Sequence, residues 1–306
     1  FVHLDDGNFY NRGRYFSSSE DVAETAKRVA DSDSYDHILF YAHDSFSSPK
    51  ACAQKIAVMQ PVFKANRIYP YHFMYGSGFV DDVKSLLSDR SDESEARLGS
   101  GHELSDRLTE ILLGRSGRAL WREMKYGAES GFAPKGDGIK VANTFLQYLV
   151  ESSQGLKGKK IHLAGHGAGS LLLGHLLNSL VNNSAKPKIA TLSLLAPTLT
   201  IDTYATMYRP QMSNIDDMAV YNLSENLELE DNVAGIYGKS ILHLISRVLE
   251  EGCSDGSVVP LLGLSRDVDE RGVENIDDVD FVISQGNVQR NKNSTSRRHN
   301  DFERDP

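Results

Sequence analysis

Residues 163–170 have the sequence LAGHGAGS, in which three glycines alternate with other residues. The residues just before it, 160–164 (KIHLA), predict a buried strand, and residues 170–181 predict a helix. A strand that turns into a helix over so few residues needs glycine, because Cβ atoms beside the tip of the turn would collide with both elements. The spacing does not match the G-x-G-x-x-G pattern of a dinucleotide-binding turn. We therefore expect a sharp strand-to-helix turn with Gly167 at its tip.

Strands and helices alternate on both sides of this turn. Continuous apolar runs such as residues 37–42 (HILFYA) are typical of parallel strands that are buried on both faces. Further strands are expected at residues 1–4, 68–75, 189–195, 218–223 and 279–284, and the first of these is expected at a sheet edge. Helices are expected at residues 18–30, 49–65, 142–149, near 201 and at 239–249. This alternation predicts an α/β fold with a doubly wound, mostly parallel sheet of about seven or eight strands.

Two segments depart from the alternation. Residues 79–132 contain a charged stretch followed by apolar residues at helical spacing, so a helical insertion, which is a possible lid, is expected there. Residues 289–306 are polar and are expected to form a loop after the last strand. No internal repeat or linker divides the chain, so we expect a single domain over residues 1–306.

The turn at residues 163–170 resembles the nucleophile elbow of the α/β-hydrolase superfamily, G-x-S-x-G, in its esterase and lipase-like form G-H-S-A-G-S. Gly165 and Gly169 match the flanking glycines of that motif, and Gly167 stands where the family has its serine. The resemblance covers most of the chain, because the other family positions follow in the expected order. It implies a sheet of the α/β-hydrolase type and a site that needs neither a cofactor nor a metal.

The resemblance also implies an acid and then a histidine after the nucleophile position. His299, in the polar loop after the last strand, is the candidate general base. The acid is expected in the acidic segment 225–231, where Asp231 is favoured as the residue that orients the histidine ring. Asp202, which follows the preceding strand, is the alternative.

An oxyanion hole is expected where the loop after an early strand meets the elbow. Related esterases have H-G or H-G-G in that loop, whereas this chain has His43 followed by Asp44. An aspartate there restricts the backbone and brings a negative charge close to where an oxyanion would form, unless Asp44 points to solvent. Loss of one oxyanion-hole donor costs on the order of 3 kcal/mol. Ala168 and His166 are expected in the same pocket.

Composition narrows the possible partners. The 306 residues are 40% hydrophobic and 25% charged, as in a globular protein, and no apolar run approaches the roughly 18 to 20 residues of a membrane span. The net charge of -9 is spread along the chain, which favours neutral or cationic partners over nucleic acid or anionic lipid. Cys52 and Cys253 provide neither a disulfide framework nor a zinc site, and the ten histidines lack metal-ligand spacing. A cytoplasmic location is expected.

Glycine cannot form an acyl-enzyme, so ordinary serine hydrolysis is excluded at Gly167. We expect a relative of serine esterases and lipases that is inactive or weakly active on ester-like small molecules. The alternative is a natural pseudoenzyme that binds a ligand or a protein. Ser170 lies nearly a full helical turn from the tip and is a poor substitute nucleophile. Water activated by His299, with Asp231 fixing the ring, would give slow general-base hydrolysis.

Overall fold

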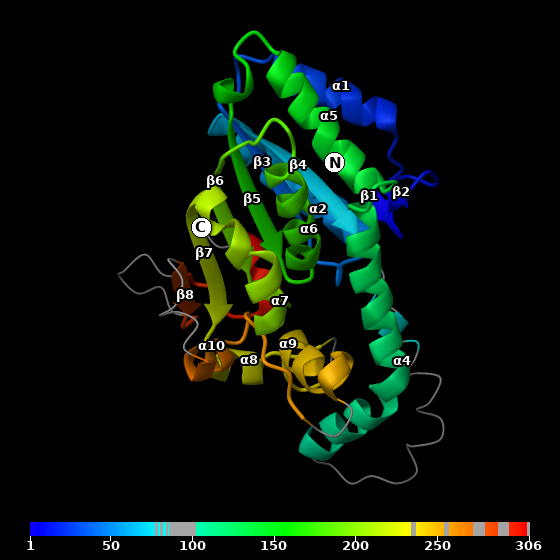
Figure 1. Cartoon of the computed structure of the whole chain (residues 1–306). Coiled ribbons are helices and arrows are strands. Elements are labelled where there is room, and N and C mark those ends of the chain that lie inside the picture. The colour runs from blue at the N-terminus through cyan, green and yellow to red at the C-terminus, as the bar shows by residue number, and fades with distance from the viewer. Residues whose placement is uncertain are drawn as a thin grey trace.

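The computed structural model describes residues 1–76, 79, 82, 83, 85, 102–233, 237–253, 257–271, 279–286 and 294–304. Within these residues the chain forms one eight-stranded sheet in the order β2-β1-β4-β3-β5-β6-β7-β8 (Figure 1). Only β1 and β2 pair in antiparallel fashion. The strands are β1 (Val2–Asp5), β2 (Asn8–Phe9), β3 (His37–Ala42), β4 (Ile68–Tyr75), β5 (Lys160–His166), β6 (Ile189–Leu195), β7 (Ile215–Leu223) and β8 (Asp280–Ser284). The predicted α/β class with a mostly parallel sheet is confirmed.

Helices cover both faces of this sheet (Figure 1). The α-helices are α1 (Ser19–Ala30), α2 (Pro49–Ala65), α4 (His102–Gly131), α5 (Asp137–Glu151), α6 (Gly169–Val181), α7 (Ile201–Met207), α8 (Glu225–Glu230), α9 (Ile241–Leu244) and α10 (Ser265–Arg271). Shorter helical segments are η1 (Leu156–Gly158), η2 (Arg209–Asn214), η3 (Ile245–Leu249, a π-helix), η4 (Glu251–Cys253) and η6 (His299–Arg304).

Alternation along β3 decides which helices meet which face. Phe40 packs edge-on against Phe145 of α5, with ring centroids 5.2 Å apart, and so belongs to the large core under α1, α5 and α6. Its neighbours Leu39 and Tyr41 face the other way and pack against Met59 and Phe63 of α2 and against the β5 side chains of that face. Successive residues of a strand point to opposite faces, so the continuous apolar run at residues 37–42 serves both layers.

The structure differs from the sequence-based expectations at several element ends. β1 is the second strand of the sheet, because Asp6 and Gly7, both with positive φ, turn the chain back so that β2 forms the edge. The helix expected at residues 239–249 is split into α9 and the π-helix η3. His299 begins a short 3-10 helix, η6, in the segment where a loop was expected.

The expected helical insertion coincides in part with α4, which is kinked at Gly114. Trp121 of this helix is fully buried, and its indole N–H donates to Glu250 Oε1 at 2.6 Å. Residues 86–101 of the expected insertion, and residues 287–293 and 305–306 around the polar C-terminal loop, lie outside the described residues. Among the residues that the structure describes, no helix is both long enough and apolar enough to cross a membrane.

The predicted turn between β5 and α6 leaves no room for side chains on its inner side. A Cβ atom added to Gly169 would lie 2.2 Å from the carbonyl oxygen of Ala42 and 2.8 Å from that of His43. Because both are backbone atoms of the neighbouring strand and its loop, neither can move aside cheaply.

Replacing Gly169 with alanine should therefore lower the free energy of unfolding by about 3 kcal/mol or more. Gly127→Ala is the matched control, since Gly127 is also helical but a Cβ there meets nothing closer than Asp6 Cα at 3.9 Å. The control should be neutral or more stable by up to about 1 kcal/mol. Urea denaturation of both variants measures the difference, and equal effects would show that the close packing at Gly169 does not matter.

Candidate functional site

The site is built around the backbone at Gly167, which has a φ of +51°, a conformation that favours glycine. Its N–H donates to Leu195 O at 2.9 Å, so the tip of the turn is fixed to the end of β6. Its carbonyl accepts a hydrogen bond of 2.6 Å from the Ser170 hydroxyl. Ser170 is fully buried, and its hydroxyl is already engaged with the turn. The Ser170 hydroxyl therefore stabilises the turn and is not free to act as a nucleophile.

Asp44 lies directly beside this turn. β3 ends at Ala42, which pairs with Gly165 of β5, so the loop after β3 is brought against Gly167. Asp44 Oδ1 accepts a hydrogen bond of 3.2 Å from the backbone N–H of Ala168. A Cβ atom built on Gly167 would lie only 2.5 Å from this Oδ1. The carboxylate therefore occupies the space that a side chain at position 167 would need.

His299 lies on the other side of the same space. Its Nε2 is 3.4 Å from Asp44 Oδ2 and would be 2.9 Å from a Cβ on Gly167. Asp44 and His299 are 1% and 3% exposed, so the pair is closed off from solvent. Burial alone would raise the pKa of Asp44, but the contact with His299 holds this pKa below its ordinary value. Asp44 is therefore a carboxylate anion at neutral pH.

Asp231 does not contact the ring of His299. Its Oδ2 accepts from the backbone N–H of His299 at 3.0 Å, and its Oδ1 accepts from the backbone N–H of Asn232 at 2.8 Å. Nδ1 of His299 has no hydrogen-bond partner among the described residues. Asp231 thus caps the first turn of η6 and fixes the position of His299 through the main chain. Asp202, the alternative acid, is exposed in the first turn of α7.

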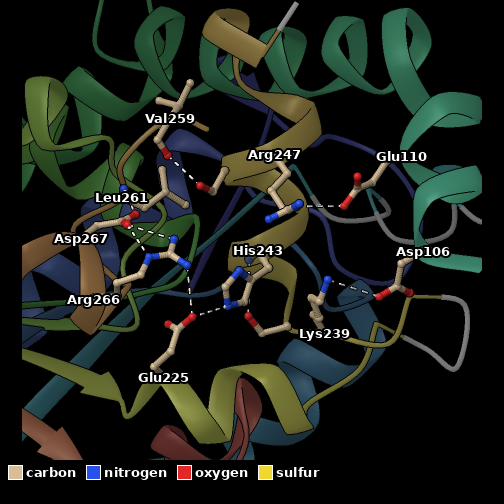
Figure 2. A network of polar contacts seen from close by, with 12 residues as sticks. Asp106, Glu110, Glu225, Lys239, His243, Arg247, Val259, Leu261, Arg266 and Asp267 are labelled. Carbon is tan, nitrogen blue, oxygen red and sulfur yellow. Dashed lines mark hydrogen bonds and ion pairs between the residues drawn. The ribbon is translucent and has the colours of Figure 1, made fainter. Parts of the chain in front are cut away.

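A network of polar contacts holds α8, the helix that presents Asp231. Figure 2 shows Glu225, at the start of this helix, pointing toward both Arg266 and His243. Its Oε1 is 3.1 Å from Arg266 Nη1 and 3.6 Å from His243 Nε2. Asp267 continues the chain of contacts, since its Oδ1 is 3.0 Å from Arg266 Nη2. The cap on His299 is therefore supported by a connected set of polar side chains from α8, α9 and α10.

The two other predicted pocket residues, His43 and His166, each have a ring nitrogen that faces Glu303. Glu303 Oε1 is 3.2 Å from His43 Nδ1 and 3.5 Å from His166 Nδ1, and Glu303 also forms an ion pair with Lys55. Burial would raise the pKa of Glu303, but His166, His43 and Lys55 hold it well below its ordinary value. These residues form a buried ionic cluster next to the turn between β5 and α6.

Asp44, His166 and His299 each offer one possible metal-ligand atom, and these atoms lie within 4.8 Å of one another. However, His166 Nε2 is 2.9 Å from the carbonyl oxygen of His299, and its Nδ1 faces Glu303. The rings of His166 and His299 are stacked, with 26° between their planes, so their in-plane lone pairs do not converge on one point. Among the described residues only two ligands then remain, fewer than the three protein ligands of a catalytic zinc site. The arrangement does not fit a zinc ion.

The burial of two glutamates, Glu303 and Glu228, was not predicted from the sequence. Glu303 lies in a polar C-terminal stretch, and no local pattern marks it as buried. Glu228 of α8 is fully buried, and neither of its carboxylate oxygens has a hydrogen-bond partner among the described residues. Burial, with smaller contributions from Asp231 and Glu225, raises the pKa of Glu228 to about 8. Its neighbours in the sequence did not mark it as buried, since Leu229 on one side of it is exposed.

Comparison with known proteins adds no family to this description, since no protein-family model matches the sequence and no curated protein is detectably similar to it.

The raised pKa of Glu228 should make stability depend on pH. The folded state retains the proton up to about pH 8, whereas an unfolded glutamate releases it near its ordinary value of about 4.3. Stability contributed by this proton is therefore lost as the pH rises through this window. Glu228→Gln should be more stable than the parent at pH 8, by an amount on the order of a few kcal/mol, and less so at pH 5. Thermal unfolding at both pH values tests this.

Glu230→Gln is the control, since Glu230 lies on the exposed side of the same helix. We expect it to shift stability equally at the two pH values. A Glu228→Gln variant with no greater pH sensitivity than this control would contradict a protonated Glu228.

The contact between Gly167 and Asp44 should appear as energetic coupling. Gly167→Ala should lower stability by about 3 kcal/mol, because the new Cβ meets Asp44 and the φ is positive. In an Asp44→Gly background the same change should cost at least about 1 kcal/mol less. Gly13→Ala measures the cost of a positive φ alone, since the nearest atom to a Cβ there is 3.8 Å away. Additive effects in this double-mutant cycle would show that Asp44 does not fill the space.

Proposed function

We propose that this chain is an α/β-hydrolase-like protein that has lost serine-dependent ester hydrolysis and acts by binding a ligand or a protein. One observation carries the proposal: the Asp44 carboxylate accepts the Ala168 N–H in the space beside Gly167. In the superfamily that the sequence resembles, the N–H after the nucleophile belongs to the oxyanion hole. Here that N–H already has an anionic partner from within the chain.

Acyl transfer needs a nucleophile and an oxyanion hole, and this arrangement is unfavourable for both. Gly167 has no hydroxyl that could attack a carbonyl, so no acyl-enzyme forms. An oxyanion that develops near the Ala168 N–H would meet the negative charge of Asp44 instead of a free donor. Loss of one donor alone lowers kcat by roughly 100- to 1,000-fold, and a fixed anion adds repulsion to that loss. The site therefore favours binding or structural use over catalysis.

Direct activation of water by His299 has less support. Nε2 of His299 faces Asp44 Oδ2 at 3.4 Å and the pair is buried, so a water molecule would have to enter between the two side chains. Asp231 contacts the main chain of His299, and therefore does not fix the tautomer of the ring as a triad acid does. A weakly active general-base enzyme is thus the less favoured form of the proposal.

Three features support the hydrolase-like part of the proposal. The turn after β5 has a positive φ at the position where the family has its serine. The loop after β3 supplies a residue next to the N–H that follows this position. His299, although it is separated from Gly167 by 132 positions, lies next to it after the last strand. Together these resemble a serine-hydrolase site in which a carboxylate has entered the space of the serine.

The test is an attempt to rebuild the site. The parent chain, Gly167→Ser and the double variant Asp44→Gly/Gly167→Ser are treated with a fluorophosphonate probe and with short- and long-chain p-nitrophenyl esters. We expect no labelling of the parent, little labelling of the single variant because Asp44 crowds the new serine, and clear labelling of the double variant. Adding His299→Ala to the double variant should suppress its reaction, since the serine then lacks its base.

Two results would contradict the proposal in different ways. Ester turnover by the parent chain that disappears with His299→Ala would show that the protein is a water-activating hydrolase. A double variant that folds, as judged by its circular dichroism and thermal transition, yet is not labelled would remove the support for a hydrolase-like site.

A further inference from the structure

A cavity of about 620 Å³ is lined by residues from the amino ends of β3, β5 and β6. It therefore lies at the opposite end of β5 from the turn at Gly167. Its volume is within the roughly 300 to 1,000 Å³ of small-molecule sites. Part of its wall is apolar and comes from Leu156, Ile161 and Pro187, of which the last two are buried. The cavity therefore has an apolar wall that an organic ligand could contact.

Lysines dominate the charge of this cavity. Five lysines line the cavity, and they come from two segments of the chain, residues 157–160 and 186–188. Only two aspartates are among the lining residues. The lysines are Lys157, Lys159, Lys160, Lys186 and Lys188, and the aspartates are Asp216 and Asp217. Residues 152–201 contain these five lysines and no acidic residue, although the whole chain has a net charge of -9. The fold thus gathers positive charge in one concave place on an acidic protein.

Among the described residues, only two of the five ammonium groups have partners. Lys159 is buried, and its Nζ donates to Ser32 O at 2.7 Å and to Tyr35 O at 2.9 Å. Lys188 lies 3.3 Å from Asp216 Oδ1. Among the described residues, the other three lysines, Lys157, Lys160 and Lys186, form no ion pair and are exposed.

Two histidines form the polar part of the cavity wall. His37 Nδ1 is 2.8 Å from His162 Nε2, and His162 Nδ1 is 2.9 Å from Thr191 Oγ1. Burial, together with the charges of His37 and Lys160, lowers the pKa of His162 to about 4, so His162 is neutral at physiological pH. His162 therefore adds no positive charge to the cavity at that pH.

We propose that this cavity binds a small organic anion that carries one or more phosphate groups. Three ammonium groups without counter-ions in one concavity raise the local concentration of anions, and the low-dielectric wall strengthens this effect. A phosphate ester carries about -1.5 to -2 charges at pH 7 and has several acceptor oxygens, so it matches several lysines better than a single carboxylate does. The apolar wall contacts the organic part of the ligand.

Isothermal titration calorimetry with inorganic tripolyphosphate as the probe tests this at physiological ionic strength. The double variant Lys160→Gln/Lys186→Gln removes one unpaired charge from each of the two segments, 157–160 and 186–188. Its affinity should fall at least about tenfold. Lys50→Gln/Lys135→Gln is the matched control, because it removes the same charge from two exposed lysines outside the cavity. The control should bind like the parent chain, and all three proteins should have the same thermal transition.

Vesicles distinguish the two sources of such a phosphate. Tripolyphosphate binding without sedimentation on phosphatidylcholine vesicles that carry phosphatidylinositol phosphate supports a free phosphorylated molecule. A lipid headgroup is supported if the parent chain sediments with these vesicles, tripolyphosphate reverses the sedimentation, and the cavity variant does not sediment. Absence of binding to either probe, or equal losses in the cavity and control variants, would overturn the proposal. None of these results depends on ester hydrolysis, so the site at Gly167 is tested separately.

Discussion

The site depends on the fit between Gly167, which has no side chain, and the buried carboxylate of Asp44. Asp44 Oδ1 would be 2.5 Å from a Cβ on Gly167, so the two positions cannot both hold a side chain in this arrangement. The anion is tolerated because it accepts the Ala168 N–H and faces His299. A buried carboxylate without such partners would be neutralised or expelled, since burial strongly disfavours an isolated charge. The glycine provides the space, and the amide and the imidazole stabilise the charge that fills it.

A second anion, Glu303, extends this arrangement away from the turn. It is 3.5 Å from His166, which in turn donates through Nε2 to the carbonyl of His299. Asp231 holds the N–H of the same residue. His299 is thus fixed at its backbone on both sides, while its ring contacts Asp44. Buried polar clusters of this kind constrain geometry when most members are satisfied, but they add little net stability over apolar packing. The cluster therefore positions the imidazole more than it stabilises the fold.

Local patterns were enough to predict most of the fold, whereas the site depends on contacts between distant residues. The apolar run at residues 37–42 and the glycines at 163–170 predicted β3 and the turn after β5, because strand burial and steric crowding act over a few residues. The direction of Asp44 could not be predicted, since it depends on the pairing of β3 with β5 across more than 100 residues. The same reason explains Glu303, whose partners come from β3, α2 and β5. The lysines of the cavity could not be predicted from the net charge either, because a sum over the whole chain does not say where the charges lie in the fold.

The same steric fit restricts which pairs of residues positions 44 and 167 can hold together. A serine at 167 beside Asp44 would place its Cβ at a separation from Oδ1 that real Cβ atoms essentially never show. Its hydroxyl would also have to share the space with His299 Nε2, only 2.9 Å from that Cβ. A side chain at position 167 and an aspartate at position 44 therefore exclude each other unless the loop after β3 moves. With the carboxylate bound to the Ala168 N–H, any single substitution of Gly167 meets this collision, so room for a side chain there requires a second change at position 44.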